Sequence, residues 1–278
     1  MTADVTGMID MHIHSSPDVR PRSRCDLELA GDAEFLGMRA IVIKSHIEST
    51  VSRAWLAHRI HPKVEVFGGI TLNKQVGGIN PYAVESAIKM GAKIVWLPTA
   101  WSRNDRKASK GIDDGIAVLD AQGEVLPDLR EILLLIRDAK IVLGLGHLSY
   151  DEALAVTSAA CQLGLNKIVV NHPEWPTMNY SFKQQAALLR HGVWFERIYA
   201  RRFSRQEPYT KNFELNVKAI QLLGWQSTII STDGGQIENP PWAEAYPEYI
   251  AYLRHAGLPE KAIDQMTRKN PAYLLGIE

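Results

Sequence analysis

The feature that most constrains the fold is a regular alternation along the chain. Short runs rich in β-branched and apolar residues are followed by longer amphipathic segments, which is typical of βα units. The polar residues that close these runs are 24 to 37 residues apart, with one gap of 48, and one βα unit takes about 30 residues. They are His14, Lys44, Asn73, Thr99, His147, His172, Glu196 and Asp233.

The alternation predicts eight strands and eight helices over residues 1–278. The strands are expected at 8–14, 40–44, 64–71, 93–97, 141–147, 167–172, 193–196 and 227–233. The helices are expected at 27–36, 52–59, 82–90, 128–138, 151–163, 182–190, 213–223 and 242–255. Several helix ends are readable, such as Ser149 before the fifth helix and Gly164 after it.

Eight such units form either a closed barrel or an open doubly wound sheet. An open sheet usually carries a glycine-rich phosphate loop after its first strand, but here that strand ends in His12-Ile13-His14-Ser15-Ser16-Pro17. The sequence therefore predicts a single (β/α)8 barrel domain over residues 1–278, a length common for this fold. A C-terminal helix is expected to follow the eighth unit.

The gap of 48 residues marks an insertion at 100–127, after the fourth strand. Within it, residues 116–126 predict a small β-hairpin that turns near Gln122 and Gly123. A long loop at this place in a barrel usually lines the active site.

Composition excludes several classes of protein. The 31 Lys and Arg residues balance 31 Asp and Glu, so no nucleic-acid partner is expected. The most apolar stretches, such as 132–145, are interrupted by charges, and the N-terminus does not resemble a signal peptide, so no membrane partner is expected. The two cysteines are far apart and form no C-x-x-C pattern. These features predict a cytoplasmic protein, which could form a homo-oligomer.

Two histidines in the first predicted strand point to a metal. His12 and His14 are two residues apart, so both side chains project from the same face of the strand, which in a barrel is the interior. Neutral imidazole is the commonest metal ligand in proteins. A hydrogen-bonded pair of structural histidines is the alternative.

Three further residues end other predicted strands. His147, His172 and Asp233 close the fifth, sixth and eighth strands, and in a barrel all strand ends converge at the C-terminal mouth, where catalytic groups lie. Five candidate ligands at one mouth indicate a divalent metal, with zinc the first expectation and manganese the second.

These motifs resemble the metal-dependent amidohydrolase superfamily. The resemblance rests on Asp10-Met11-His12-Ile13-His14, on the strand-end residues His147, His172 and Asp233, and on a closing Asn270-Pro271-Ala272-Tyr273-Leu274-Leu275-Gly276. It implies a metal-dependent hydrolase with one or two ions, the first held by His12, His14 and Asp233. It also implies that His147 and His172 hold a second ion or orient the substrate, and that Asp233 is the catalytic proton shuttle.

The sequence departs from the family at the fourth strand. Two-metal members commonly have a carboxylated lysine or a glutamate there, whereas this strand ends in Trp96-Leu97-Pro98-Thr99. Lys44, after three β-branched residues, is costly to bury as an ammonium. Three roles stay open for Lys44: a catalytic or substrate contact, a carbamate ligand, or an ion pair. His46 is a candidate ligand or substrate contact.

Other residues near the strand ends suggest an anionic substrate. Arg22 follows the first strand in a proline-flanked loop, and its planar guanidinium suits a carboxylate or phosphate. The run from Arg106 to Lys110 is interpreted as a solvated loop, with substrate contact as the alternative. Glu196 is a candidate substrate contact. Trp175 and other strand-end aromatics could line the substrate site or pack in the core.

The sequence thus predicts hydrolysis of an amide, lactam or lactone/ester bond in a small, carboxylated substrate. A metal-dependent decarboxylase or carbon–carbon lyase and a phosphoesterase are the alternatives. A phosphoesterase is disfavoured because no glutamate follows the third strand, which ends in Thr71-Leu72-Asn73. A non-enzymatic binding protein would require all five candidate ligands to be relics.

Overall fold

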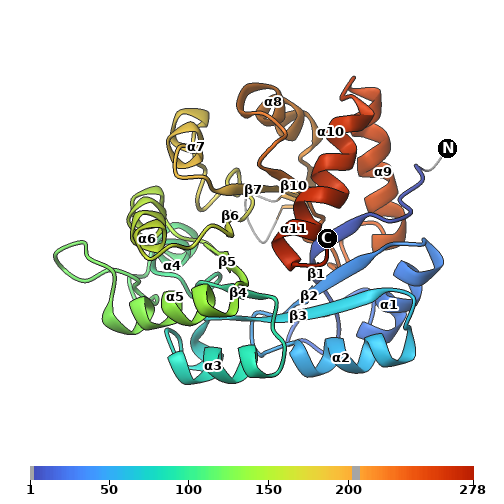
Figure 1. The fold of residues 1–278 in the computed structure, drawn as a ribbon. Helices are drawn as coiled ribbons and strands as arrows, with labels where there is room; N and C mark the ends of the chain where they lie inside the picture. The colour runs from blue at the N-terminus through green and yellow to red at the C-terminus, as the bar shows by residue number, and fades with distance from the viewer. Residues whose placement is uncertain (1–2, 202–206) are drawn as a thin grey trace. The chain divides into compact units, whose positions relative to one another are not determined.

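The computed structural model describes residues 3–201 and 207–278, and within them the predicted alternation of strands and helices is present (Figure 1). Eight strands form one sheet in the order β1-β2-β3-β4-β5-β6-β7-β10. They are β1 (Ile9–His14), β2 (Ala40–Lys44), β3 (Glu65–Thr71), β4 (Ile94–Trp96), β5 (Val142–Gly144), β6 (Ile168–Val170), β7 (Trp194–Arg197) and β10 (Thr228–Ile230). The order and the intervening helices confirm the predicted (β/α)8 barrel.

The helices lie close to their predicted positions. They are α1 (Asp26–Phe35), α2 (Val51–Ile60), α3 (Pro81–Lys89), α4 (Arg103–Lys110), α5 (Pro127–Ala139), α6 (Tyr150–Gln162), α7 (Phe182–Leu189), α8 (Phe213–Leu223), α9 (Trp242–His255), α10 (Glu260–Asp264) and α11 (Asn270–Leu275). Ser149 caps α6 by accepting from the backbone of Glu152, as its position predicts. None of the helices in the described part of the chain combines the length and apolar character that a membrane crossing requires.

Two compact units make up the chain. The first comprises Met1–Ser45, Thr50–Gly68 and Glu196–Glu278, and the second comprises His46–Ser49 and Gly69–Phe195. The single-domain organisation stays a prediction, and each unit is described by itself.

In the first unit, β1 and β2 run parallel, and His14 lies opposite Lys44 in the register. Helices α1 and α2 contact each other, as do α8 and α9. The core includes Ile13, Ile41 and Ile43 of the strands and Tyr246 and Tyr249 of α9, all fully buried. Burial of this apolar surface is the main favourable contribution to the stability of the unit.

The predicted C-terminal helix is present as a series of short helical elements. After α10, residues Gln265–Lys269 form a π-helix, labelled η2, and α11 follows directly. Both η2 and α11 contact β1, beside which α11 is drawn in red in Figure 1. The Asn270 side chain donates to the carbonyl of Thr228 at 2.6 Å. The closing motif therefore holds the first residue of β10 in place.

In the second unit, close packing between neighbouring strands requires glycine at one position. Trp96 of β4 lies opposite Gly144 of β5, and a Cβ on Gly144 would come within 2.5 Å of the Trp96 ring. Trp96 is 1% exposed. This strand-end aromatic therefore packs in the core, which was one of its two predicted roles.

The insertion after β4 contains a helix that was not predicted. Residues Arg103–Lys110 form α4, so the expectation of a solvated loop from Arg106 to Lys110 is wrong. Ser102 caps the helix by accepting from the Asp105 backbone, and Gly111 ends it in the left-handed conformation, at φ 67°. Ion pairs line the helix: the pair of Arg103 with Asp113 is exposed, whereas in the pair of Arg106 with Asp114 the arginine is buried.

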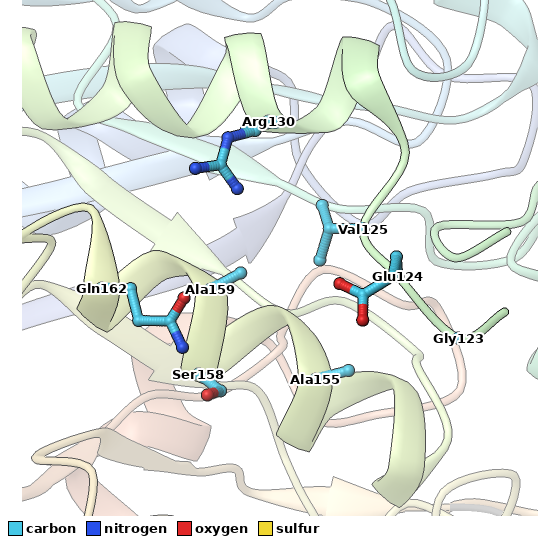
Figure 2. A pocket seen from close by; sticks show the side chains of 8 residues that line it. All are labelled: Gly123, Glu124, Val125, Arg130, Ala155, Ser158, Ala159 and Gln162. Atoms are coloured by element: carbon cyan, nitrogen blue, oxygen red, sulfur yellow. The ribbon is translucent and has the colours of Figure 1, made fainter.

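The predicted hairpin is present only as a tight turn. Leu119 and Val125 form a single antiparallel bridge, with Gly123 at φ 82° between them. A hollow of about 250 Å³ lies between this turn and helices α5 and α6, lined by Glu124, Arg130 and small residues of α6 (Figure 2). None of the predicted site residues lines it.

Candidate metal centre

The first unit brings together the two histidines of β1. His12 and His14 alternate with apolar neighbours, so both project from one face of the strand, and they are 0% and 1% exposed. Their ring centroids are 5.3 Å apart. The predicted common face of these two residues is confirmed.

Asp10 lies on the same face and fixes the strand to the loop after β10. Its carboxylate accepts from the Thr232 hydroxyl at 2.6 Å, from the Trp242 indole at 2.9 Å and from the His12 backbone at 3.0 Å. Burial raises the pKa of Asp10 to about 6, although these donors lower it. No separate role was predicted for Asp10, although its two-residue spacing from His12 is the sequence signal that could have identified it.

Asp233 lies in the loop that follows β10 rather than at the end of the strand. The predicted strand at 227–233 ends at Ile230, and Asp233 adopts a positive φ of 49°. The His14 backbone N–H donates to the carbonyl of Gly234 at 2.9 Å, and Ser23 donates to Gly235 at 3.0 Å. These bonds hold the loop against the end of β1.

One carboxylate oxygen of Asp233 faces both histidines. Asp233 Oδ1 lies 3.1 Å from His12 Nε2 and 3.2 Å from His14 Nε2. One ligand atom from each of the three residues lies within 4.8 Å of the others. Two imidazole nitrogens and one carboxylate oxygen, all buried, are a donor set that Zn²⁺ and Mn²⁺ accept, so the residues fit a divalent cation.

The charge states of two of these residues suit metal binding. Burial acts to raise the pKa of Asp233, but His12 and His14 more than offset it and hold that pKa well below its usual range. Burial, together with the nearby charge of Arg22, lowers the pKa of His14 well below its usual value. Near neutral pH, Asp233 is therefore ionised and His14 is neutral, as metal coordination requires.

Glu196 contacts the other side of the His12 ring. Its Oε2 lies 3.0 Å from His12 Nδ1, so a proton on Nδ1 is donated to a carboxylate and Nε2 faces Asp233. Burial lowers the pKa of His12, but Asp233 and Glu196 raise it to about 9. A cation bound here must therefore displace a proton from His12. The prediction that Glu196 contacts substrate stays a prediction.

Lys44 lies close to Nε2 of His12, the nitrogen that also faces Asp233. Its Nζ lies 3.0 Å from His12 Nε2, and the residue is 1% exposed. Burial lowers the pKa of Lys44 to about 8, although Asp233 and Glu196 act in the opposite direction. The amine is thus partly neutral near physiological pH. The three predicted roles of Lys44 all remain open.

Arg22 is paired with an acid that the sequence analysis missed. The Nε and Nη2 atoms of Arg22 each lie 2.7 Å from Oδ2 of Asp18, and the two side chains are 3% and 2% exposed. Their spacing of four residues in one loop was the available signal. Anion binding by Arg22 stays a prediction, with Asp18 as the group that an anion would have to compete with.

The second unit contains the other two predicted ligands. His147 and His172 follow β5 and β6 by three and two residues, and their ring centroids are 5.1 Å apart. Trp175 lies against both rings, at 6.3 Å from His147 and 5.4 Å from His172. His147 Nδ1 lies 2.5 Å from Oδ2 of Asp105, a residue of α4. No local sequence signal connects Asp105 to this pair.

His46 also belongs to the second unit, where neutral groups contact it. Its Nδ1 lies 2.9 Å from the Thr99 hydroxyl. The Asn73 side chain donates to the carbonyl of His46 at 3.0 Å and to the Thr99 hydroxyl at 2.8 Å. His46 is therefore tied to the residues that follow β3 and β4, and its proposed contact with substrate stays a prediction.

Comparisons with known proteins agree with the fold. A model of a family of unknown function, DUF6282, matches residues 7–196. No curated protein matches the sequence. An amidohydrolase from Pseudomonas aeruginosa is similar in structure, with a TM-score of 0.66, 12% identity, and 96% of this chain and 95% of that chain covered.

Two further solved structures are similar over nearly their whole length. A protein assigned as a dipeptidase, also from Pseudomonas aeruginosa, has a TM-score of 0.70 and 11% identity, with 97% and 94% of the two chains covered. A protein from Pseudomonas putida assigned as a 2-pyrone-4,6-dicarboxylic acid hydrolase has a TM-score of 0.64 and 16% identity, with 99% and 98% covered. The predicted likeness to the amidohydrolase barrels is thus confirmed at the level of the fold.

Proposed function

The chain belongs to the DUF6282 family of unknown function, and we propose that it is a metal-dependent hydrolase of small, carboxylated substrates. The observation that carries the proposal is the meeting of Asp233 Oδ1 with the Nε2 atoms of His12 and His14, at 3.1 Å and 3.2 Å. Burying two imidazoles and an ionised carboxylate together is costly unless each is hydrogen-bonded or coordinates a cation.

In this proposal, His12, His14 and Asp233 hold one divalent cation. When bound, the cation supplies Lewis acidity that activates water and polarises a carbonyl. Glu196 orients His12 by accepting from Nδ1, which leaves Nε2 available to the cation. Asp10 stabilises the arrangement of these three ligands, because it fixes β1 to the loop that carries Asp233.

Asp233 is the proposed proton carrier. Its carboxylate is ionised near neutral pH, so it can accept a proton from the attacking water and donate it to the leaving group. Of the three proposed ligands, it alone is an acid. Lys44 is the alternative carrier, because its lowered pKa, about 8, lies near the operating pH.

Two buried basic side chains support an anionic substrate. Both Arg22 and Lys44 are buried in the first unit, and the charge of Arg22 acts on His14 and on Lys44. We propose a carboxylated amide, lactam or lactone as the substrate class. The similar protein assigned as a hydrolase of a pyrone dicarboxylic acid is consistent with that class.

A substrate screen tests the proposal. Untagged protein is stripped with a chelator, reloaded with zinc or manganese, and assayed with carboxylated lactones, lactams and amides and with their uncharged analogues. We expect metal-dependent ring opening or amide cleavage that is faster for the carboxylated member of each pair. The matched control is Asp233→Asn, prepared and loaded in the same way.

The same screen separates the alternative reactions. Release of carbon dioxide would identify a decarboxylase, and release of inorganic phosphate from phosphate esters would identify a phosphoesterase. Protein that neither binds a divalent metal nor cleaves any member of the panel would contradict the proposal. We retain His147 and His172 as candidates for a second ion or for orienting the substrate.

A further inference from the structure

We propose that Asp105, a residue of the inserted helix α4, is a positioning residue that holds His147 as the tautomer protonated on Nδ1, so that Nε2 is presented as a lone-pair donor. The inference rests on the proposed function, in which His147 contacts an ion or the substrate. It adds a residue that lies 42 positions from His147 in the sequence.

The contact between the two side chains is short and partly shielded from water. Oδ2 of Asp105 lies 2.5 Å from Nδ1 of His147, and the two residues are 9% and 7% exposed. The Thr177 hydroxyl donates to the same oxygen at 3.4 Å, and the Ser109 hydroxyl donates to Oδ1 at 3.1 Å. Asp105 is therefore held from three sides.

The first turn of α4 also fixes the backbone of His147. The Ser102 hydroxyl and the Asn104 amide donate to the carbonyl of His147, at 2.8 Å and 3.1 Å. The same Asn104 amide donates to the carbonyl of Thr177 at 2.8 Å. The insertion thus clamps the segments that follow β5 and β6 as well as the imidazole itself.

The chemistry of a carboxylate determines which nitrogen carries the proton. An ionised carboxylate only accepts hydrogen bonds, so the nitrogen that faces it must be the donor. Both oxygens of Asp105 accept from hydroxyl groups, Oδ1 from Ser109 and Oδ2 from Thr177, which is the acceptor role of an ionised carboxylate. A neutral His147 ring is then protonated on Nδ1, and its lone pair is on Nε2. Metal-ligating histidines are commonly oriented by a carboxylate in this way.

Nitrogen NMR on the full-length chain tests the inference without an activity assay. Protein labelled with ¹⁵N-histidine is treated with a chelator and measured at mildly alkaline pH, and the His147 signals are assigned by their loss in His147→Gln. We expect His147 to be protonated on Nδ1 in the wild type. In Asp105→Asn the amide can donate as well as accept, so we expect that preference to be lost. Asp113→Asn, in the same insertion but exposed and paired with Arg103, is the matched control and should change nothing.

The outcomes separate the inference from the proposed function. Protonation of His147 on Nε2 in the wild type overturns the inference, as does an unchanged tautomer in Asp105→Asn. Because the wild-type tautomer of His147 is measured without a variant at position 105, it tests the inference even where Asp105→Asn fails to fold. If the protein is also a hydrolase, Asp105→Asn should lower activity by about 10- to 100-fold. Expected tautomers in a protein without hydrolase activity would support the positioning role and contradict the proposed function.

Discussion

Gly235 lies against the backbone of His14 so closely that no other residue fits. A Cβ at position 235 would come 1.8 Å from the His14 carbonyl oxygen, and Gly235 has a φ of 96°. Gly257 has a similar φ of 84°, but a Cβ there would meet no atom within 4 Å. The two glycines therefore separate the effect of close approach from the effect of backbone conformation.

We expect Gly235→Ala to disrupt the metal centre and Gly257→Ala to leave it intact. Gly257→Ala should cost about 1 to 2 kcal/mol, the penalty for a left-handed alanine. Gly235→Ala should cost a further 1 to 3 kcal/mol, roughly, because the overlap forces the loop to move. Chemical denaturation measures the loss of stability in each variant, and a zinc titration measures whether the metal centre still binds zinc. Equal losses of stability and full zinc binding in both variants would contradict the close approach as a requirement.

The second prediction concerns metal binding by β1. Zinc at a hundredfold excess over its Kd should stabilise the wild type by about 2.7 kcal/mol, because only the folded chain holds the site. His12→Asn and His14→Asn should each abolish that gain and lose bound metal in elemental analysis. His255→Asn, an exposed histidine at the end of α9, is the control. A zinc-dependent shift in Tm that persists in both β1 variants would place the metal elsewhere.

The third prediction concerns proton transfer by Asp233. Asp233→Asn keeps the size of the side chain and an oxygen toward the metal but removes the titratable group. Bound metal should largely persist, while kcat falls by about 100-fold or more. Asp138→Asn, on the exposed side of α5, should change neither quantity. Near-normal turnover in Asp233→Asn across the pH range would move the proton carrier to Lys44, His46 or Glu196.

A fourth prediction follows from the position of Glu196 on the His12 ring. Glu196→Gln keeps an oxygen that can accept from Nδ1 but removes the charge, so zinc affinity should fall by about 10- to 100-fold. Isothermal titration measures the change. The His12 ring also loses a carboxylate that raises its pKa, and if that effect dominated, zinc affinity would rise instead and the orienting role would be refuted.

The fifth prediction separates the two possible effects of Arg22. Arg22→Ala should raise KM for a carboxylated substrate, with a smaller change for its uncharged analogue. It also leaves Asp18 buried without its partner, which costs about 3 to 5 kcal/mol. The double variant Asp18→Asn/Arg22→Ala should recover part of that stability but not the low KM. Unchanged KM and kcat for a carboxylated substrate in the single variant would refute the assignment.

The sequence predicted the fold well because each βα unit carries its own local signals. The eight main helices lie within one residue or so of their predicted ends, with Ser149 capping α6 as expected. Four of the eight strands were predicted too long at their C-terminal ends, most clearly β5, which stops at Gly144, and β10, which stops at Ile230. In both cases the predicted end was the polar residue that closes the run, His147 or Asp233, but strand pairing stops three residues before it.

The residues that support the site were harder to predict. The sequence of α4 contains no large apolar side chain, so no apolar stripe marks it as a helix, and it is held by a serine cap and by ion pairs. Asp105 and Asp18 act on the site through their contacts with His147 and with Arg22. Such contacts depend on the path of a loop, which periodicity does not encode. Asp10 was within reach, because it shares the face of His12 and His14.

The bond between Asp10 and Thr232 joins positions 222 residues apart, and the three proposed ligands, from His12 to Asp233, span nearly the same length of chain. During synthesis, the histidines of β1 leave the ribosome long before Asp233 exists, so this set of ligands is complete only near the end of translation. A nascent chain lacking the last strand therefore offers a passing cation only two of its three donors. Capture of the cation would then be a late step of maturation, because the bound cation would join residues from the two ends of the chain.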